Sequence, residues 1–261
     1  MALTETQQVM AHALERARRE RRPIESFQPR FPDVTIAEAY QIQAYVASRQ
    51  ESLGNPVVGY KMGMTSLAKQ RSIGLTSPVY GRLFREGVSQ SGEPLRRDGL
   101  IHPRVEPEIG LVLGRSLTGP GVSAHQVIRN TVSVVACLEI LDSRYQDFKF
   151  SITDVIADNT SESRVYVGNK ICSAQDFDWG TEGIVLQKNG ATVQCGAGAA
   201  VLGHPANAIA MLANLLAEDG ESVPPGVLLL TGGITEAVPV ELGDHIVCRW
   251  QHLGEIQFMC M

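Results

Sequence analysis

The sequence predicts an α+β protein in which a helical N-terminal part precedes a mixed or antiparallel β-roll. Three observations support this fold class. About the first 50 residues have helical patterns, the rest is mostly short apolar runs broken by glycine and proline, and helices and strands do not alternate regularly. A doubly wound parallel sheet is therefore disfavoured, because it needs a helix after nearly every strand.

Residues 1–56 form the expected helical segment. One amphipathic, charged helix should run from Thr4 to about Arg22, and a second should cover Ala37–Gln50. Thr35 and Glu38 have the spacing of a capping box, which predicts the start of the second helix. A proline-rich stretch, residues 23–32, separates the two.

Residues 57–261 form the expected catalytic β-roll domain. The expected strands are VVGYKMG, VYGRLF, EIGLVLG, VVACLEIL, RVYVG, GIVLQKNG, ATVQCGAG, GVLLLTGG, AVPVELGDHIVCRW and GEIQFMCM. The dipeptide Asn189-Gly190 is typical of a tight hairpin turn. One clear helix is expected at Pro205–Glu218, where proline suits the first helical position.

Composition excludes several classes of protein. The chain has 261 residues, is 44% hydrophobic and 20% charged, and has a net charge of -5 with a pI of about 5.7, which argues against nucleic acid as a partner. The apolar runs are too short to span a membrane, and the N-terminus lacks the apolar core of a signal peptide. Five scattered cysteines fit reduced thiols, so we expect a cytoplasmic protein.

Two glutamates, Glu106 and Glu108, form the most informative pair in the chain. They lie in HPRVEPEIGLVLG, an expected strand. Residues two apart point to the same face of a strand, about 6.5–7 Å apart. Like charges on a half-buried face are costly unless a divalent cation compensates them, and carboxylate oxygens suit Mg2+ or Mn2+. The pair alone also fits a solvated edge strand.

Glu139 is a third carboxylate of interest. It lies in CLEIL, an apolar strand in which a single carboxylate is costly unless it is paired, protonated or bound to metal. Three carboxylates could form an oxygen cage for Mg2+, although the sequence does not show that they meet.

Five other polar residues could line a site, and each has an ordinary alternative. Lys61 could extend to the surface or, if buried, have a lowered pKa that suits proton transfer. Arg144 could form a salt bridge or serve in catalysis. Ser161 and Arg164 lie in a polar segment that could line a site or complete a loop, and Thr231 could bind a carboxylate or turn the chain.

Seven motifs together resemble the fumarylacetoacetate hydrolase-like superfamily, and the resemblance extends over nearly the whole chain. In order they are GYKMGMTS, SPVYGRL, HPRVEPEIGLVLG, LEILDSRYQDFKF, ADNTSESR, GAGAAVLGHP and TGGITEAVPVELGD. More narrowly, they are similar to its branch of 2-keto-4-pentenoate hydratases and 4-oxalocrotonate decarboxylases. The resemblance implies a β-roll of the fumarylacetoacetate hydrolase C-terminal type.

The resemblance also implies the members of a site. In that family the E-x-E pair and the glutamate of LEI-x-DSR hold Mg2+ or Mn2+, which assigns Glu106, Glu108 and Glu139 as ligands here. Lys61 is the expected catalytic residue. The resemblance also implies substrate contacts from Lys61 and Ser161. Beyond the resemblance, we expect substrate contacts from Leu83, Arg144, Arg164 and Thr231, and either arginine could hold the distal carboxylate of the substrate.

The implied reaction is metal-dependent decarboxylation of 2-oxo-3-hexenedioate to 2-oxopent-4-enoate and CO2, in meta-cleavage degradation of aromatic compounds. RYQDFKF and TGGIT-x-AVPV resemble the decarboxylases, and Val79 stands where hydratases tend to carry an acidic residue. Glu236 departs from the small residue expected there. The alternatives are a 2-keto-4-pentenoate hydratase and a non-catalytic partner of a hydratase. The expected partners are a small 2-oxo dicarboxylic acid, further copies of the chain and a vinylpyruvate hydratase.

Overall fold

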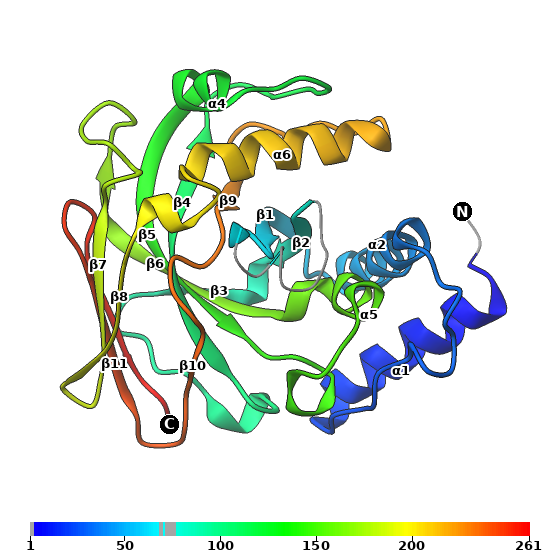
Figure 1. Ribbon diagram of the computed structural model, residues 1–261. Coiled ribbons are helices and arrows are strands. Elements are labelled where there is room, and N and C mark those ends of the chain that lie inside the picture. Colours follow the sequence, from blue (N-terminus) through cyan, green and yellow to red (C-terminus); the bar gives the residue numbers. More distant parts are fainter. Residues whose placement is uncertain (1–2, 68–69, 71–76) are drawn as a thin grey trace.

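The computed structural model describes residues 3–67, 70 and 77–261. Two β-sheets form the body of the molecule, and the N-terminal helices lie together at one side of it (Figure 1). Helix α1 spans Glu5–Glu20 and helix α2 spans Ile36–Ser52, each begun by a threonine capping box. Both expected helices are confirmed to within two residues at each end.

The larger sheet is mixed, as expected. Its described strands are β1 (Val57–Gly63), β2 (Val79–Phe84), β3 (Val88–Gln90), β4 (Arg104–Leu113), β5 (Thr131–Leu141), β6 (Glu162–Cys172), β9 (Leu228–Leu230) and β10 (Val238–Pro239). They are ordered β2-β1-β9-β4-β5-β6-β3, with β10 paired to β4. The pairs β1–β9 and β3–β6 are parallel and the others are antiparallel.

The smaller sheet is antiparallel and packs against the larger one. Its strands are β7 (Gly183–Lys188), β8 (Ala191–Ala197), β11 (His245–Trp250) and β12 (Gly254–Met259), in the order β12-β11-β7-β8. Tyr166 of β6 stacks on Phe258 of β12 with ring centroids 4.6 Å apart, which joins the sheets.

Asn189 and Gly190 have φ values of 54° and 82° and connect β7 to β8, so the expected hairpin is confirmed.

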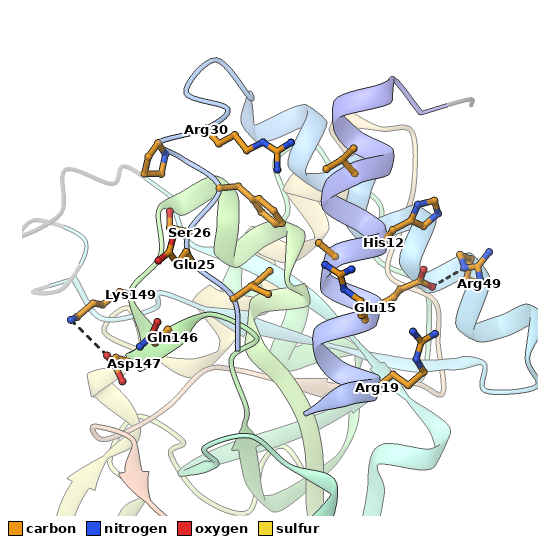
Figure 2. A pocket seen from close by; sticks show the side chains of 16 residues that line it. His12, Glu15, Arg19, Glu25, Ser26, Arg30, Arg49, Gln146, Asp147 and Lys149 are labelled. Atoms are coloured by element: carbon orange, nitrogen blue, oxygen red, sulfur yellow. Dashed lines mark hydrogen bonds and ion pairs between the residues drawn. The ribbon is translucent and has the colours of Figure 1, made fainter. Parts of the chain in front are cut away.

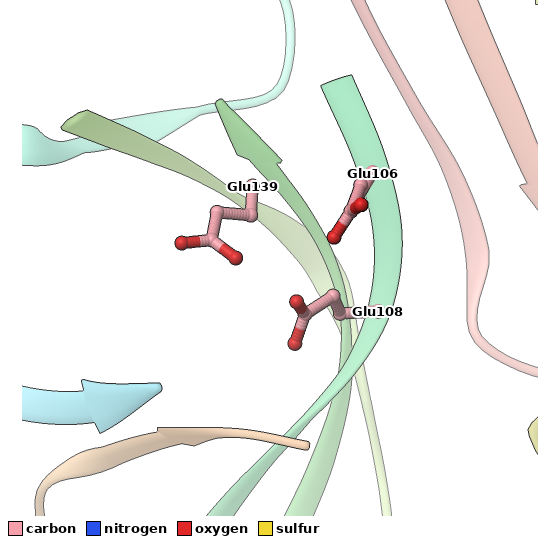
Figure 3. Close-up of side chains that lie close together, drawn as sticks. All are labelled: Glu106, Glu108 and Glu139. Atoms are coloured by element: carbon pink, nitrogen blue, oxygen red, sulfur yellow. The ribbon is translucent and has the colours of Figure 1, made fainter. Parts of the chain in front are cut away.

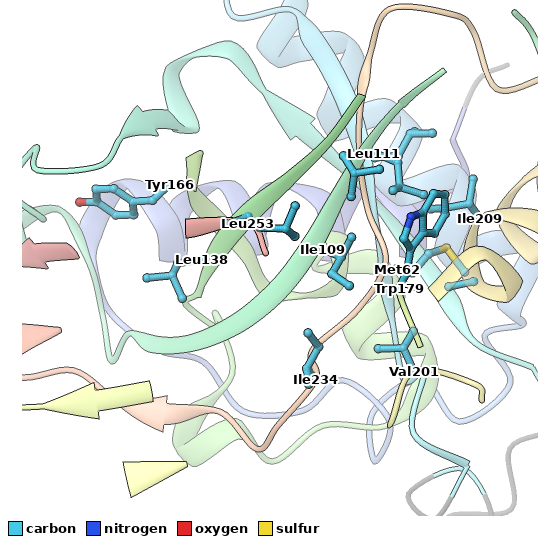
Figure 4. Packing of buried hydrophobic residues seen from close by; sticks show 14 of the residues in the cluster. Met62, Ile109, Leu111, Leu138, Tyr166, Trp179, Val201, Ile209, Ile234 and Leu253 are labelled. Atoms are coloured by element: carbon cyan, nitrogen blue, oxygen red, sulfur yellow. The ribbon is translucent and has the colours of Figure 1, made fainter. Parts of the chain in front are cut away.

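Helix α6 (Pro205–Glu218) covers one side of the sheets and has the bounds that the sequence predicts (Figure 1). Its apolar face contributes Ile209 to the main core, which also contains Met62, Ile109 and Trp179 (Figure 4). By length and mean hydropathy, 1.4, the segment Gly198–Glu218 could cross a membrane, but half of that window is buried inside the protein, as in a core helix.

Short helical elements were missed by the sequence analysis. The described chain also contains α4 (Ala124–Asn130), α5 (Ile152–Ala157) and 3-10 turns at Arg85–Gly87, Arg97–Gly99, Gln146–Phe148, Asn159–Ser161 and Gly198–Ala200. The expectation of a single clear helix after residue 57 was therefore wrong. The segment Val155–Arg164 is not only a polar loop, because it begins with the buried end of α5, which packs under α1 and α2.

The boundary at 56/57 falls between α2 and β1, and the division into two domains stays a prediction.

Gly59 allows β1 and β9 to lie close together. A Cβ atom at Gly59 would lie 2.0 Å from the backbone oxygen of Leu228, which cannot yield as a side chain would. We expect Gly59→Ala to lower the free energy of unfolding by about 2 kcal/mol or more. Gly99→Ala is the matched control, because a Cβ there meets no atom within 4 Å, and its effect should be within about 0.5 kcal/mol. Urea denaturation measures both, and equal stability of the two variants would contradict this packing.

Candidate metal centre

Three carboxylates meet on adjacent strands of the larger sheet. Glu106 and Glu108 lie on β4, Glu139 lies on β5, and Glu106 and Glu139 are direct cross-strand partners. One ligand oxygen from each residue lies within 4.8 Å of those from the other two. Figure 3 shows the three side chains pointing into one space. The structure thus brings together the three residues that the family resemblance implied.

Two members of this carboxylate trio, Glu108 and Glu139, are fully buried and only partly hydrogen-bonded by the described residues. Glu108 and Glu139 are 0% exposed. The backbone N–H of Gly232 donates to Glu108 Oε2 at 2.7 Å, but Glu108 Oε1 and Glu139 Oε2 receive no hydrogen bond from a described residue. Burial raises the pKa of Glu108 well above its usual value, and the charge of Glu139 raises it further. Unpaired buried oxygens from hard carboxylate ligands are the donor set that Mg2+ requires, so the trio fits such an ion.

Lys61 is buried against the trio. Its Nζ lies 3.0 Å from Glu139 Oε1 and donates to the backbone oxygen of Thr160 at 3.1 Å. Burial lowers the pKa of Lys61, but the charges of Glu139, Glu108 and Glu106 outweigh burial, so the net pKa is raised. The surface position considered for Lys61 is therefore wrong. Its pKa is raised, and not lowered as expected on burial. A charged ammonium group therefore faces the carboxylates.

The ion pair between Lys61 and Glu139 depends on curvature of the sheet. Lys61 is on β1 and Glu139 is on β5, and strands β9 and β4 lie between them in the sheet order. Three strand spacings of a flat sheet would separate them by about 14 Å. Because the two side chains are in contact, the sheet curls around the trio, which is the geometry of a roll.

A left-handed turn holds Thr160 under Lys61. Asn159, Thr160 and Ser161 have φ values of 52°, 51° and 59°, a conformation that is costly for a β-branched residue. The Asn159 side chain fixes this turn to β2, accepting from the N–H of Arg82 at 2.7 Å and donating to its carbonyl at 2.8 Å. Such a strained backbone persists only where surrounding contacts hold it. Here the contacts of Asn159 with β2 hold the turn that gives Lys61 an acceptor, the carbonyl of Thr160.

A cavity of about 570 Å3 opens beside the trio. Lys61, Glu106 and Ser161 line it, together with Val79, the residue that stands where hydratases tend to carry an acidic one. Glu236 also lies at the cavity, on an exposed position. Cavities of this size and mixed lining bind small organic acids.

Leu83 and Thr231 do not line this cavity. Leu83 is 0% exposed and packs in an apolar cluster with Cys137, the cross-strand partner of Glu108. Thr231 is also 0% exposed, and its hydroxyl donates to the carbonyl of Ile109 at 3.0 Å. We therefore correct their expected role as substrate contacts. Both support the strands that carry the trio.

The two arginines expected to hold a distal carboxylate also lie outside the cavity wall. Arg144 is buried and forms an ion pair with Asp158, and it donates to the carbonyls of Asp142 and Glu162. Arg164 is the neighbour of Val165, the cross-strand partner of Glu139, so its side chain points to the opposite face of β6. The salt-bridge alternative for Arg144 is confirmed, and neither arginine reaches the cavity.

Arg104 and Phe148 are among the cavity residues that the sequence analysis missed. Arg104 lies two residues before Glu106 on β4, and Phe148 lies in the 3-10 turn after β5. The alternation of a strand would have found Arg104, because residues 104, 106 and 108 share one face. Phe148 could not be found in this way, since its segment has no regular period.

A larger hollow, of about 1100 Å3, lies beside α1 and away from the trio. Long charged side chains surround it, and two ion pairs, Arg49–Glu15 and Lys149–Asp147, lie on its rim (Figure 2). Its polar groups are mostly exposed and do not converge on one point. The trio is therefore the better candidate for chemistry.

Comparison with known proteins supports the fold and identifies the family. The 4-oxalocrotonate decarboxylase of Pseudomonas sp. (strain CF600) is 47% identical over 226 residues, which cover 87% of this chain and 86% of that protein. The 2-keto-4-pentenoate hydratase of Paraburkholderia xenovorans (strain LB400) is 35% identical, with 95% and 92% coverage. The solved structure of the 4-oxalocrotonate decarboxylase from Pseudomonas putida G7, complexed with magnesium and adipate, has a TM-score of 0.97 and 42% identity, and the match covers 100% of this chain and 99% of that one. The family model described as fumarylacetoacetate (FAA) hydrolase C-terminal matches residues 64–259. This chain belongs to the fumarylacetoacetate hydrolase C-terminal family.

Proposed function

We propose that this protein is a Mg2+-dependent carboxy-lyase that converts 2-oxo-3-hexenedioate to 2-oxopent-4-enoate and CO2 in meta-cleavage degradation of aromatic compounds. The observation that supports it most is the convergence of the carboxylate trio and Lys61 beside a cavity, in a chain whose backbone superposes on a decarboxylase complexed with magnesium and adipate. Adipate is a six-carbon diacid, as is the proposed substrate.

In this proposal Glu106, Glu108 and Glu139 hold the cation. When bound, the cation supplies a Lewis acid that stabilises negative charge on the 2-oxo oxygen of the substrate. Decarboxylation breaks the bond between C5 and C6, and the electron pair moves through the conjugated double bond toward the 2-oxo oxygen. A proton added at C3 completes 2-oxopent-4-enoate.

Lys61 is the residue that we assign to orienting the substrate or delivering this proton. An ammonium group has three N–H donors. Glu139 and Thr160 engage two of them, and Lys61 lines the cavity, so one donor is left for the substrate. The charges of the trio raise the pKa of Lys61 in the metal-free protein, and a protonated Lys61 would serve as the acid in this step.

Val79 favours decarboxylation over hydration. It lines the cavity and is 5% exposed. A valine cannot donate a proton or orient a water molecule, whereas an apolar wall favours conversion of a carboxylate into neutral CO2. A hydratase would use the same trio, but this chain has Val79 where hydratases tend to carry an acidic residue.

We also propose a cytoplasmic homo-oligomer that associates with a vinylpyruvate hydratase. The family contains both decarboxylases and hydratases, and the product of the proposed reaction is the kind of molecule that such a hydratase would take. Light scattering of the purified protein, alone and mixed with a hydratase, tests this association.

The reaction itself is tested with purified protein, Mg2+ and 2-oxo-3-hexenedioate. We expect stoichiometric release of CO2, and we expect it to stop when EDTA removes the metal. Hydration of 2-hydroxypenta-2,4-dienoate without release of CO2 would favour the hydratase instead. No reaction with either compound would leave the non-catalytic partner as the correct reading.

The metal assignment is tested by Glu106→Gln. Loss of one charged ligand should weaken Mg2+ binding by more than about 100-fold and abolish turnover. Glu162→Gln is a matched control: Glu162 is buried, its pKa is raised to about 7 by burial and by the charge of Glu139, and it lies outside the trio. The control should bind Mg2+ within about threefold of the parent protein. Isothermal titration calorimetry measures both, and equal losses would contradict the trio as the metal site.

The role of Lys61 is tested by Lys61→Met. Removal of a cation that faces the trio should leave Mg2+ binding as tight or tighter, because the repulsion between two cations is lost. The kcat value should fall about 100-fold or more. Lys61→Arg retains the charge and serves as the comparison. If Mg2+ affinity and kcat fell together in Lys61→Met, Lys61 would be a support for the ligands and not a catalytic residue.

A further inference from the structure

Arg104 shares the cavity with the trio. It lies on β4 two residues before Glu106, on the same face of the strand, and its cross-strand partner Leu141 also lines the cavity. Two residues of strand advance about 6.6 Å. The guanidinium group of Arg104 therefore extends from the same wall as the proposed metal ligands.

The position of the Arg104 guanidinium is fixed by Phe148. The guanidinium carbon lies 4.2 Å from the centroid of the Phe148 ring, within the range of a cation–π contact. Phe148 and its neighbour Asp147 have φ values of 57° and 55°, an uncommon conformation for residues with side chains. The ring of His102 lies 4.8 Å from that of Phe148, and His102 Nε2 lies 2.8 Å from the Ser143 carbonyl. Stacking on Phe148 therefore favours one orientation of the Arg104 guanidinium in the cavity.

Arg104 also supplies the cavity with a positive charge that forms no ion pair with a carboxylate in the described part of the chain. Among the described residues that line the cavity, the cationic side chains are Lys61 and Arg104. Lys61 is in an ion pair with Glu139. No described carboxylate lies within ion-pair distance of Arg104, which instead stacks on Phe148. A second anion in the cavity would find its partner there.

The spacing of Arg104 and Glu106 suits a diacid. Five bonds join the carboxyl carbons of a six-carbon diacid, and six backbone bonds separate residues two apart in a strand. The carbon chain and the strand segment therefore have similar lengths. A 2-oxo acid end at the trio would place the other carboxylate beside the guanidinium group, which binds carboxylates through paired N–H donors.

We propose that Arg104, stacked on Phe148, is the specificity-determining residue that recognises the second carboxylate of the substrate and selects 2-oxo diacids over 2-oxo monoacids. This inference rests on the proposed function. The attraction between the Arg104 guanidinium and this second carboxylate is strongest before the reaction, because the carboxylate becomes neutral as CO2 leaves. Arg104 therefore contributes to substrate binding more than to the chemical step.

The test compares two ligands that differ only in the second carboxylate, 2-oxoadipate and 2-oxohexanoate. Both are saturated, so binding to the Mg2+-loaded protein is measured without turnover by calorimetry. We expect Arg104→Gln to weaken the binding of 2-oxoadipate about tenfold or more. The affinities for 2-oxohexanoate and for Mg2+ should change by less than about twofold. Arg104→Lys should fall between, since lysine lacks the planar fork. Phe148→Leu should weaken 2-oxoadipate selectively and by less than Arg104→Gln does.

Kinetics supply an independent readout. With 2-oxo-3-hexenedioate, Arg104→Gln should raise KM about tenfold and change kcat by less than about threefold. Equal losses of both ligands, or an unchanged affinity for 2-oxoadipate, would overturn the inference. If the parent protein releases no CO2, the proposed function fails. The binding comparison can still be made, so the two failures are distinguishable.

Discussion

Three carboxylates on one buried face of two paired strands set the main constraint on this structure. Glu106 and Glu139 are in direct register, so their charges cannot separate while β4 and β5 remain paired. The sheet curls, and this brings Lys61 from β1 to Glu139, while the N–H of Gly232 after β9 reaches Glu108. Among the described residues, Lys61 and the Gly232 amide partner Glu139 and Glu108, and a dication bound between the three carboxylates would offset charge that remains on their buried oxygens.

The residues around the trio hold its side chains and Lys61 in position. Gly233 leaves space for Glu106, since a Cβ there would lie 2.4 Å from Glu106 Oε2. The left-handed turn at Asn159–Ser161 gives Lys61 its second acceptor and is tied to β2 through Asn159. Arg144 and Asp158 anchor the start of the same turn. Residues that first suggested substrate binding, such as Arg144 and Thr231, therefore act on the site by holding its backbone.

Local signals in the sequence predicted most elements, and non-local pairing determined the rest. The bounds of β1, β2 and α6 were predicted without error because glycine and proline mark their ends. The helices α4 and α5 were missed, although Ser123 and Ser151 carry capping-box spacing that could have indicated them. The family resemblance implied the trio. The sequence analysis proposed Arg144 and Arg164 for the distal carboxylate and did not consider Arg104, because the partner of Arg144, Asp158, and the cavity position of Arg104 follow only from the folded sheet.

If one divalent cation offsets the buried charge of the trio, anomalous diffraction from crystals soaked in Mn2+ will locate it. We expect one strong anomalous peak inside the larger sheet, about 2.0–2.3 Å from an oxygen of each of Glu106, Glu108 and Glu139. A peak elsewhere with none between these residues, or a peak that persists unchanged in Glu106→Gln, would contradict it.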